Sequence, residues 1–169
     1  QMIEPGETWS PTWELDQPAA TLWFHPHLHG ATGQHVYRGA AGMFIVDDPE
    51  AEGSGLPEEY GVDDVPLIVQ DRRFSADGSF DFSAPLFSSV GVLGEDILVN
   101  GTHDPHFEAT TSLVRFRVLN ASNARVYNLG FDDDRPYWQV GADSGLLEEP
   151  NETTRLLLSP GERAEIVVE

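Results

Sequence analysis

Short apolar runs with a repeat of two residues dominate this sequence. In residues 112–120, SLVRFRVLN, the apolar side chains of Val114, Phe116 and Val118 alternate with Arg115 and Arg117. Side chains of a β-strand point alternately to opposite faces, so this run predicts a strand with one apolar and one polar face. Comparable apolar runs lie at residues 42–48, 65–74, 96–101 and 163–169, with clusters of Gly, Pro, Asn and Asp between them. The chain is therefore predicted to be all-β.

Local turn signals refine this prediction. Asp77-Gly78 follows the run at residues 65–74 and is typical of a hairpin turn. No segment has the apolar repeat of a long amphipathic helix, and we expect one helical turn at most, near residues 56–60.

The division of the chain is suggested by an acidic segment rich in Gly and Pro. Residues 51–61, AEGSGLPEEYG, are typical of a linker. They would separate residues 1–50 from residues 62–169. The first part holds too few strands to close a sheet, so we expect it to be part of a domain with open strand edges. Such edges predict a chain that associates with itself.

Composition excludes several classes of function. The formal net charge is −20, and all nine basic residues are Arg. Such a chain would repel nucleic-acid phosphates and attract cations. The absence of Cys excludes disulfides, a zinc–thiolate site and a thiol nucleophile. No apolar run approaches the roughly 18–20 residues that cross a membrane.

Histidines at alternate positions give the strongest chemical signal. In residues 21–33, TLWFHPHLHGATG, an extended backbone would place Trp23, His25, His27 and His29 on one side. Pro26 has no N–H for a sheet ladder and marks a strand edge or a strand end. Imidazole is a good ligand for copper, zinc, iron and nickel. The spacing indicates a metal site, and a structural or surface group of histidines remains the alternative.

Other polar residues have simpler interpretations. The remaining histidines, which lack partners in the sequence, are interpreted as solvent-exposed: His35, His103 and His106. The acidic residues near turns are interpreted as turn and surface positions rather than cation ligands: Asp63, Asp64, Asp71 and residues 132–134. The arginines at positions 115, 117 and 125 are predicted to pair with nearby carboxylates.

Residues 21–49, TLWFHPHLHGATGQHVYRGAAGMFIVDDP, resemble the second histidine motif of the multicopper oxidases. The resemblance is strongest to the branch of bacterial copper-efflux oxidases and bilirubin oxidases, which share WFHPHxHG. It continues in order through nearly the whole chain, at residues 60–82, 97–101, 115–131, 135–150 and 159–168.

The resemblance implies a cupredoxin-like fold, a Greek-key β-barrel or sandwich. Residues 1–50 would be the C-terminal part of cupredoxin domain 1, and residues 62–169 a second domain without its own copper, truncated at its C-terminus. His25 and His27 would each bind one copper of the type 3 pair in a trinuclear cluster. His29 would orient a neighbouring ligand or a water, and Trp23 would pack beside the site. Family membership also implies export to the periplasm or the cell exterior.

The departures from the family pattern limit what this chain can do alone. The family's cluster uses eight histidines in four His-x-His pairs, of which this chain has one pair, and its electron-accepting copper needs a Cys. The parent protein would oxidise cuprous ion or a phenolic in one-electron steps and reduce O2 to water. The partners implied are the rest of domain 1 and the C-terminal cupredoxin domain. The isolated chain is expected to be inactive.

Other protein classes fit the residues less well or remain open. A copper nitrite reductase would have a Cys near this position, and a cupin would have a Glu about four residues after its His-x-His; neither is present. A non-enzymatic copper-binding or interaction module built from cupredoxin-like domains remains the alternative function.

Overall fold

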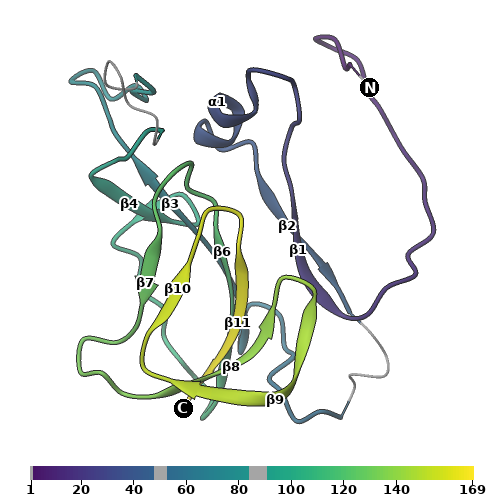
Figure 1. Cartoon of the computed structure of the whole chain (residues 1–169), viewed down its shortest axis with the longest axis vertical. Helices are drawn as coiled ribbons and strands as arrows, with labels where there is room; N and C mark the ends of the chain where they lie inside the picture. Colours follow the sequence, from purple (N-terminus) through teal and green to yellow (C-terminus); the bar gives the residue numbers. More distant parts are fainter. Residues whose placement is uncertain (1, 48–52, 84–90) are drawn as a thin grey trace.

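The computed structural model describes residues 2–47, 53–83 and 91–169. Its first unit is an antiparallel hairpin of β1 (Ala20–Phe24) and β2 (Gly42–Val46), with Ala20 opposite Val46 and Phe24 opposite Gly42. The helix α1 (Thr32–Tyr37) lies in the connection between them. Figure 1 shows this hairpin standing beside a larger β unit, with α1 at its upper end. The histidine motif therefore lies at the end of the hairpin that carries the helix.

The larger unit, called here the main unit, spans residues 60–169 and is built on a seven-stranded sheet. In spatial order its strands are β5 (Thr102–His103), β4 (Asp96–Val99), β3 (Asp64–Arg72), β6 (Val114–Asn120), β11 (Arg163–Val168), β8 (Tyr137–Ala142) and β9 (Gly145–Thr153). β3 and β6 run parallel, and the other neighbours run antiparallel.

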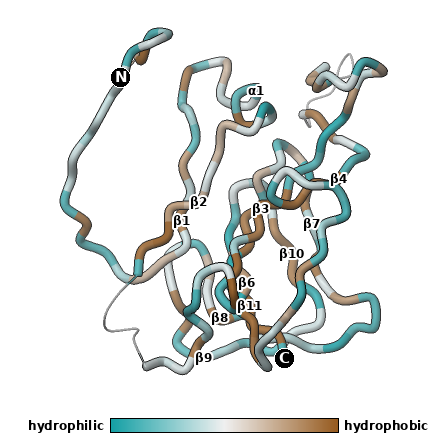
Figure 2. The backbone as a smooth tube through the Cα atoms, turned by 180° about the vertical axis from the view of Figure 1, so that it is seen from behind, coloured by the Kyte–Doolittle hydropathy of each residue, from teal (hydrophilic) through white to brown (hydrophobic). Residues whose placement is uncertain are grey.

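A second, two-stranded sheet covers one face of this sheet. It pairs β7 (Tyr127–Leu129) with β10 (Leu156–Leu158). The core between the two sheets consists of Val69, Val118, Tyr137, Leu158, Ala164 and Ile166. Figure 2 shows the hydrophobic segments of β3, β6 and β11 gathered inside the main unit. The predicted all-β class is confirmed, and Val118 faces the core as the alternation in residues 112–120 requires.

The opposite face of the seven-stranded sheet carries a buried ion cluster and is covered by the hairpin. Arg117 on β6 donates to both Asp64 carboxylate oxygens, at 2.7 Å from Nε to Oδ1 and 2.7 Å from Nη2 to Oδ2. Its Nη1 donates to Thr21 Oγ1 on β1 at 3.1 Å and to Glu165 Oε1 on β11 at 3.3 Å. The Thr21 hydroxyl donates to Glu165 at 2.6 Å, and Arg115 also donates to Glu165. Hydrogen bonds therefore join the hairpin directly to the sheet.

Burial makes this ion cluster a strong constraint. Thr21, Asp64, Arg117 and Glu165 are each less than 5% exposed. Burial alone would lower the pKa of Arg117, but its bonds to Asp64 and its attraction to Glu165 raise the pKa overall. Arg117 is thus held as a cation between carboxylates. The predicted pairing of the arginines at 115, 117 and 125 with carboxylates is confirmed.

The local turn predictions had mixed outcomes. Gly78 has φ 81° in the predicted hairpin turn, and Asp77 Oδ1 accepts hydrogen bonds from the amide and hydroxyl of Ser79, so that prediction is confirmed. The helical turn expected near residues 56–60 forms slightly later, at residues 59–63, where the Glu59 carbonyl accepts from the amides of Val62 at 2.9 Å and Asp63 at 3.0 Å. Of the predicted linker, residues 51 and 52 lie outside the described residues. The division into domains stays a prediction.

Residues 2–19 precede the hairpin without joining a sheet. Figure 1 shows them as an extended segment that curves away from the rest of the chain. Trp9 and Trp13 on this segment are 54% and 62% exposed. Among the described residues, no helix is both long and apolar enough to cross a membrane.

The ion cluster predicts a large effect of one substitution. Arg117→Met should destabilise the chain by about 3–5 kcal/mol, because it leaves the Asp64 carboxylate buried without its cation and removes one of the two arginine partners of Glu165. Urea unfolding of both proteins measures this free energy. Arg135→Met is the matched control, since Arg135 and Asp133 form an exposed pair and its loss should cost about 1 kcal/mol or less. Equal losses in the two variants would contradict a structural role for the cluster.

The bare hairpin edges and the exposed tryptophans predict self-association. At concentrations on the order of tens of micromolar, sedimentation velocity should show dimers or larger species. One compact monomer across that range would overturn this expectation.

Candidate metal site

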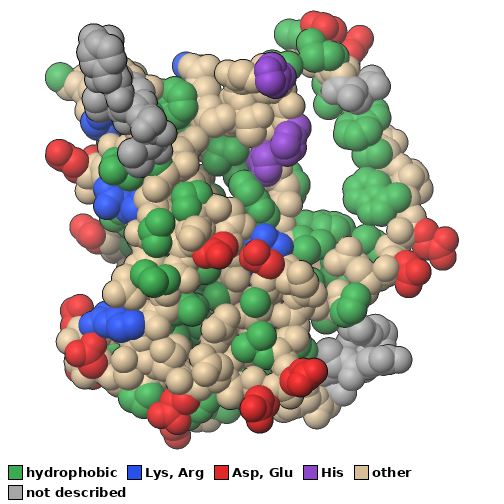
Figure 3. Space-filling view, in the orientation of Figure 1, with side chains coloured by type: hydrophobic (Ala, Val, Ile, Leu, Met, Phe, Trp, Pro, Cys, Tyr) green, Lys and Arg blue, Asp and Glu red, His purple; other side chains and the backbone are tan. Residues whose placement is uncertain are grey.

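The histidine stretch lies where β1 ends. The strand stops at Phe24, and His25 to Leu28 continue without ladder pairing. Pro26 lacks the N–H that a further ladder bond would need, so the strand ends where the sequence indicated. Figure 3 shows the histidine side chains at the surface of the upper part of the molecule. The motif is therefore a strand-end site and not the continuous strand face that the spacing suggested.

Three aromatic rings of the motif nevertheless lie in a row. The Trp23 and His25 ring centroids are 4.3 Å apart, and those of His25 and His27 are 4.7 Å apart. The interplanar angles are 31° and 35°. His25 is half-buried, and His27 is exposed. Both imidazoles are thus on one side of the backbone and close enough to serve neighbouring metal ions.

A backbone carbonyl also favours one tautomer of the His25 imidazole. His25 Nδ1 lies 3.0 Å from the carbonyl oxygen of Pro26 and donates to it when it carries the proton. In that tautomer the lone pair of Nε2 remains available for a metal. A ring nitrogen that donates to a backbone carbonyl is the usual partner of a metal-binding nitrogen on the same ring. His25 therefore fits a copper ligand that binds through Nε2.

A cavity of about 880 Å³ opens beside the two histidines. Its other residues are predominantly apolar and come from the N-terminal segment, the motif and the connection between α1 and β2: Met2, Ile3, Trp9, Phe24, Pro26, Leu28, Gly39, Ala40 and Ala41. Within the described ranges, no group of three or more His, Cys, Asp or Glu side chains could hold a metal ion. The chain offers two imidazoles next to an apolar cavity, and further ligands would have to come from elsewhere.

The helix that follows the motif was not predicted from the sequence. The sequence predicts no helix here, but residues 32–37 form α1, with Val36 and Tyr37 buried. Tyr37 packs against Phe82 of the main unit, with 4.9 Å between the ring centroids. The six-residue length and the Gly33 inside it give little helical signal, so tertiary packing decides this element.

The other histidines are spread over the fold. His29 is exposed in a turn after the ring row, and its orienting role stays a prediction. His103 and His106 are exposed, as expected. His35 on α1 was expected to be exposed but is half-buried, and within the described chain its buried Nδ1 has no hydrogen-bond partner. The reason is that α1 packs on the main unit.

Two acidic residues that were expected at the surface are buried instead. Asp64 is 4% exposed, and Asp71 is fully buried. Asp71 Oδ2 accepts hydrogen bonds from the Gly94 amide at 2.7 Å and from Arg125 Nε at 3.0 Å. Both carboxylates pair with arginines, Asp64 with buried Arg117 and Asp71 with half-buried Arg125, which a single sequence does not reveal because the partners are far apart along the chain.

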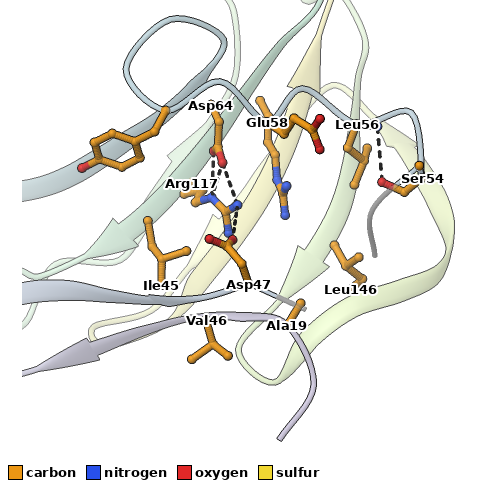
Figure 4. A pocket seen from close by; sticks show the side chains of 13 residues that line it. Ala19, Ile45, Val46, Asp47, Ser54, Leu56, Glu58, Asp64, Arg117 and Leu146 are labelled. Atoms are coloured by element: carbon orange, nitrogen blue, oxygen red, sulfur yellow. Dashed lines mark hydrogen bonds and ion pairs between the residues drawn. The ribbon is translucent and has the colours of Figure 1, made fainter. Parts of the chain in front are cut away.

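A second cavity, of about 790 Å³, lies between the hairpin and the main unit. Figure 4 shows Arg117 at its edge, pointing toward Asp64 and Asp47. The Asp47 carboxylate is 3.8 Å from Arg117 Nη2. This cavity is continuous with the ion cluster, and both arginines that line it, Arg115 and Arg117, are already paired with carboxylates. The histidine motif is therefore the better candidate for a functional site.

Comparison with known proteins places this fold and motif in a class. Residues 1–51 match the family model described as multicopper oxidase. A laccase-like multicopper oxidase, CueO, from Ochrobactrum sp. superposes with a TM-score of 0.91 at 41% identity, covering 98% of this chain and 37% of that one. The multicopper oxidase McoA of Aquifex aeolicus gives a TM-score of 0.85 at 39% identity, covering 94% of this chain and 35% of that one. The structure is thus that of a cupredoxin-like protein.

Curated relatives carry a different name. The cell division protein FtsP of Xenorhabdus nematophila is 44% identical over 169 residues, which is 100% of this chain and 35% of that protein. FtsP of Escherichia coli K12 is 41% identical over 100% of this chain and 36% of that protein. The chain belongs to the multicopper oxidase family and spans about a third of the length of these relatives.

The site makes a direct prediction about copper. The unsubstituted 169-residue chain should bind Cu(II) weakly. The double variant His25→Ala/His27→Ala should weaken binding by at least about tenfold, because both imidazole ligands are lost. Competition titration with a copper chelator measures both affinities. His103→Ala/His106→Ala is the control for non-specific histidine binding and should leave the affinity unchanged. Equal losses in the two double variants would rule out the motif as the site.

Proposed function

We propose that this chain is the copper-ligand-bearing segment of an exported multicopper oxidase. His25 and His27 would each bind one copper of the type 3 pair. The main unit would be the second cupredoxin domain, without its own copper. The observation that carries the proposal is the ring row, in which both imidazoles lie on one side of a strand end beside an apolar cavity.

The residues of this chain have definite roles in such a site. The bound copper would supply the redox chemistry by which O2 is reduced to water. The Pro26 carbonyl oxygen holds the His25 ring through Nδ1, and the Trp23 ring packs against the same ring at a tilt of 31°. The apolar side chains of Phe24 and Leu28 border the cavity beside the imidazoles. The chain thus orients two imidazoles, while the other ligands, the electron-accepting copper and the substrate site would belong to the rest of the parent protein.

Charge supports a cationic substrate or cofactor. The net charge of −20 raises the concentration of cations near the surface, which suits the capture of copper ions. Cuprous ion or a phenolic remains the substrate class that the family resemblance implies.

The curated relatives support a second candidate. Both relatives described above are named cell division proteins, and they align with the whole chain at 44% and 41% identity. A member of this family acting in cell division would use the fold as a non-enzymatic interaction module. Fold alone does not separate the two functions, because function depends on the site. The decisive property is whether the parent protein binds a full copper complement.

The isolated chain should not be an oxidase. With copper added it should show no intense blue absorption, since it has no Cys thiolate to supply that band. Oxygen uptake with cuprous ion or a phenolic donor should equal that of free copper at the same concentration. Uptake well above free copper that disappears in His25→Ala/His27→Ala would contradict this expectation.

The full-length parent protein separates the two candidate functions. An oxidase should bind several coppers and lose oxygen uptake when His25 and His27 are replaced by Ala. A cell-division module should retain its role in division with both substitutions. Loss of copper and retention of division in one variant would decide for the second candidate.

A further inference from the structure

The helix after the histidine motif is fastened to the main unit at several points. Arg72 on β3 donates from Nη2 to the carbonyl of Val36 at 3.3 Å, and its guanidinium lies 4.7 Å from the centre of the Tyr37 ring. Tyr37 in turn donates to the Asp81 carbonyl at 3.0 Å and accepts from the Arg73 amide at 2.7 Å. These contacts join α1 to a strand that is far from it in the sequence.

An amide side chain makes a second, independent attachment. Asn123 Nδ2 donates to the carbonyl of Gly33 at 2.9 Å. A Cβ atom at position 33 would lie 3.0 Å from that nitrogen, so any larger residue there would have to push the amide away by a few tenths of an ångström. Arg72 and Asn123 thus hold both ends of the short helix.

The start of the helix is bonded to the end of the histidine motif. The carbonyl oxygen of Leu28 accepts from the amides of Ala31 at 3.0 Å and Thr32 at 3.1 Å. It also accepts from the Thr32 hydroxyl at 3.1 Å. Leu28 directly follows His27. Displacement of α1 would therefore be transmitted to the backbone that carries the second imidazole.

The motif is fixed on its other side by the hairpin. Phe24 pairs with Gly42 across the β1–β2 ladder, and a Cβ at position 42 would lie 2.7 Å from the Phe24 ring. Residues 25–27 are thus held between a ladder on one side and the helix on the other. The exposure of His27 means that its own side chain contributes little to its position. The position of His27 must therefore be set by the two backbone attachments, the β1–β2 ladder and α1.

We infer that Arg72 and Asn123 are positioning residues for the copper ligands, acting through α1 and Leu28 on His27. This inference rests on the proposed copper-binding function of His25 and His27. Neither residue touches the imidazoles, and Arg72 is 1% exposed within the main unit. The cost of ordering two ligands is reduced when the fold has already ordered their backbone. Copper affinity should therefore depend on residues outside the hairpin.

The test measures Cu(II) affinity and thermal stability of the whole 169-residue chain in parallel. Arg72→Met should weaken Cu(II) binding by about tenfold and Asn123→Ala by about threefold, in line with residues that orient metal ligands. Amide hydrogen exchange at Ala31 and Thr32 should become faster in both variants. Asn123→Ala removes a single donor from a half-buried side chain, and it keeps the inference testable if Arg72→Met does not fold.

Each variant has a matched control in the same unit. Arg115→Met also removes a buried arginine, but Arg115 pairs with Glu165 and has no bond to α1. Asn100→Ala also removes an amide donor, which bonds the carbonyl of Pro66 at 2.9 Å. Both controls should lower the melting temperature and leave the Cu(II) affinity and the Ala31 and Thr32 exchange rates unchanged.

The outcomes separate this inference from the proposed function. One outcome is that His25→Ala/His27→Ala abolishes Cu(II) binding while folded Asn123→Ala and Arg72→Met keep the affinity of the unsubstituted chain within twofold. The inference is then overturned and the proposed function stands. If the double histidine variant binds copper with the affinity of the unsubstituted chain, both the inference and the proposed function are overturned. If the controls weaken binding as much as the variants, general destabilisation explains the loss and the inference is overturned.

Discussion

The arrangement of the chain depends on one buried cation. Arg117 lies between Asp64 and Glu165 and also donates to Thr21 of the hairpin. Charges with so little exposure are stable only when they are paired and hydrogen-bonded. The hairpin therefore has one well-defined way to cover the sheet, in which the Thr21 hydroxyl meets the cluster. An apolar contact of the same area would be less selective about register.

The position of the histidine site follows from that docking. With β1 fixed on the sheet, its end at Phe24 lies at the top of the hairpin, and the motif begins there (Figure 1). The helix after it then reaches the end of β3, where Arg72 meets the Val36 carbonyl and the Tyr37 ring. A surface motif with one half-buried and one exposed imidazole is thus supported by contacts that are themselves buried. This support explains how a half-buried and an exposed imidazole can keep a defined spacing.

The fold of this chain also occurs in proteins that are named for different functions. The laccase-like oxidase from Ochrobactrum sp. and the FtsP proteins resemble this chain to a similar degree, at 41% and 41–44% identity. The main unit and its ion cluster concern stability, whereas the proposed copper chemistry would depend on a few side chains at the strand end. Overall similarity therefore establishes the family but not the activity, and the histidine site must be tested by itself.

The sequence by itself determined the local features. Alternation in residues 112–120 predicted which side of β6 faces the core, Pro26 predicted the end of β1, and Asp77-Gly78 predicted its turn, because each depends on neighbours along the chain. Tertiary structure decided the rest. The six-residue α1 has too little intrinsic stability to be predicted and forms where Tyr37 is buried. Asp64 looked like a surface residue because its partner, Arg117, is 53 positions away. Burial and long-range pairing depend on which strands meet, and one sequence does not record this.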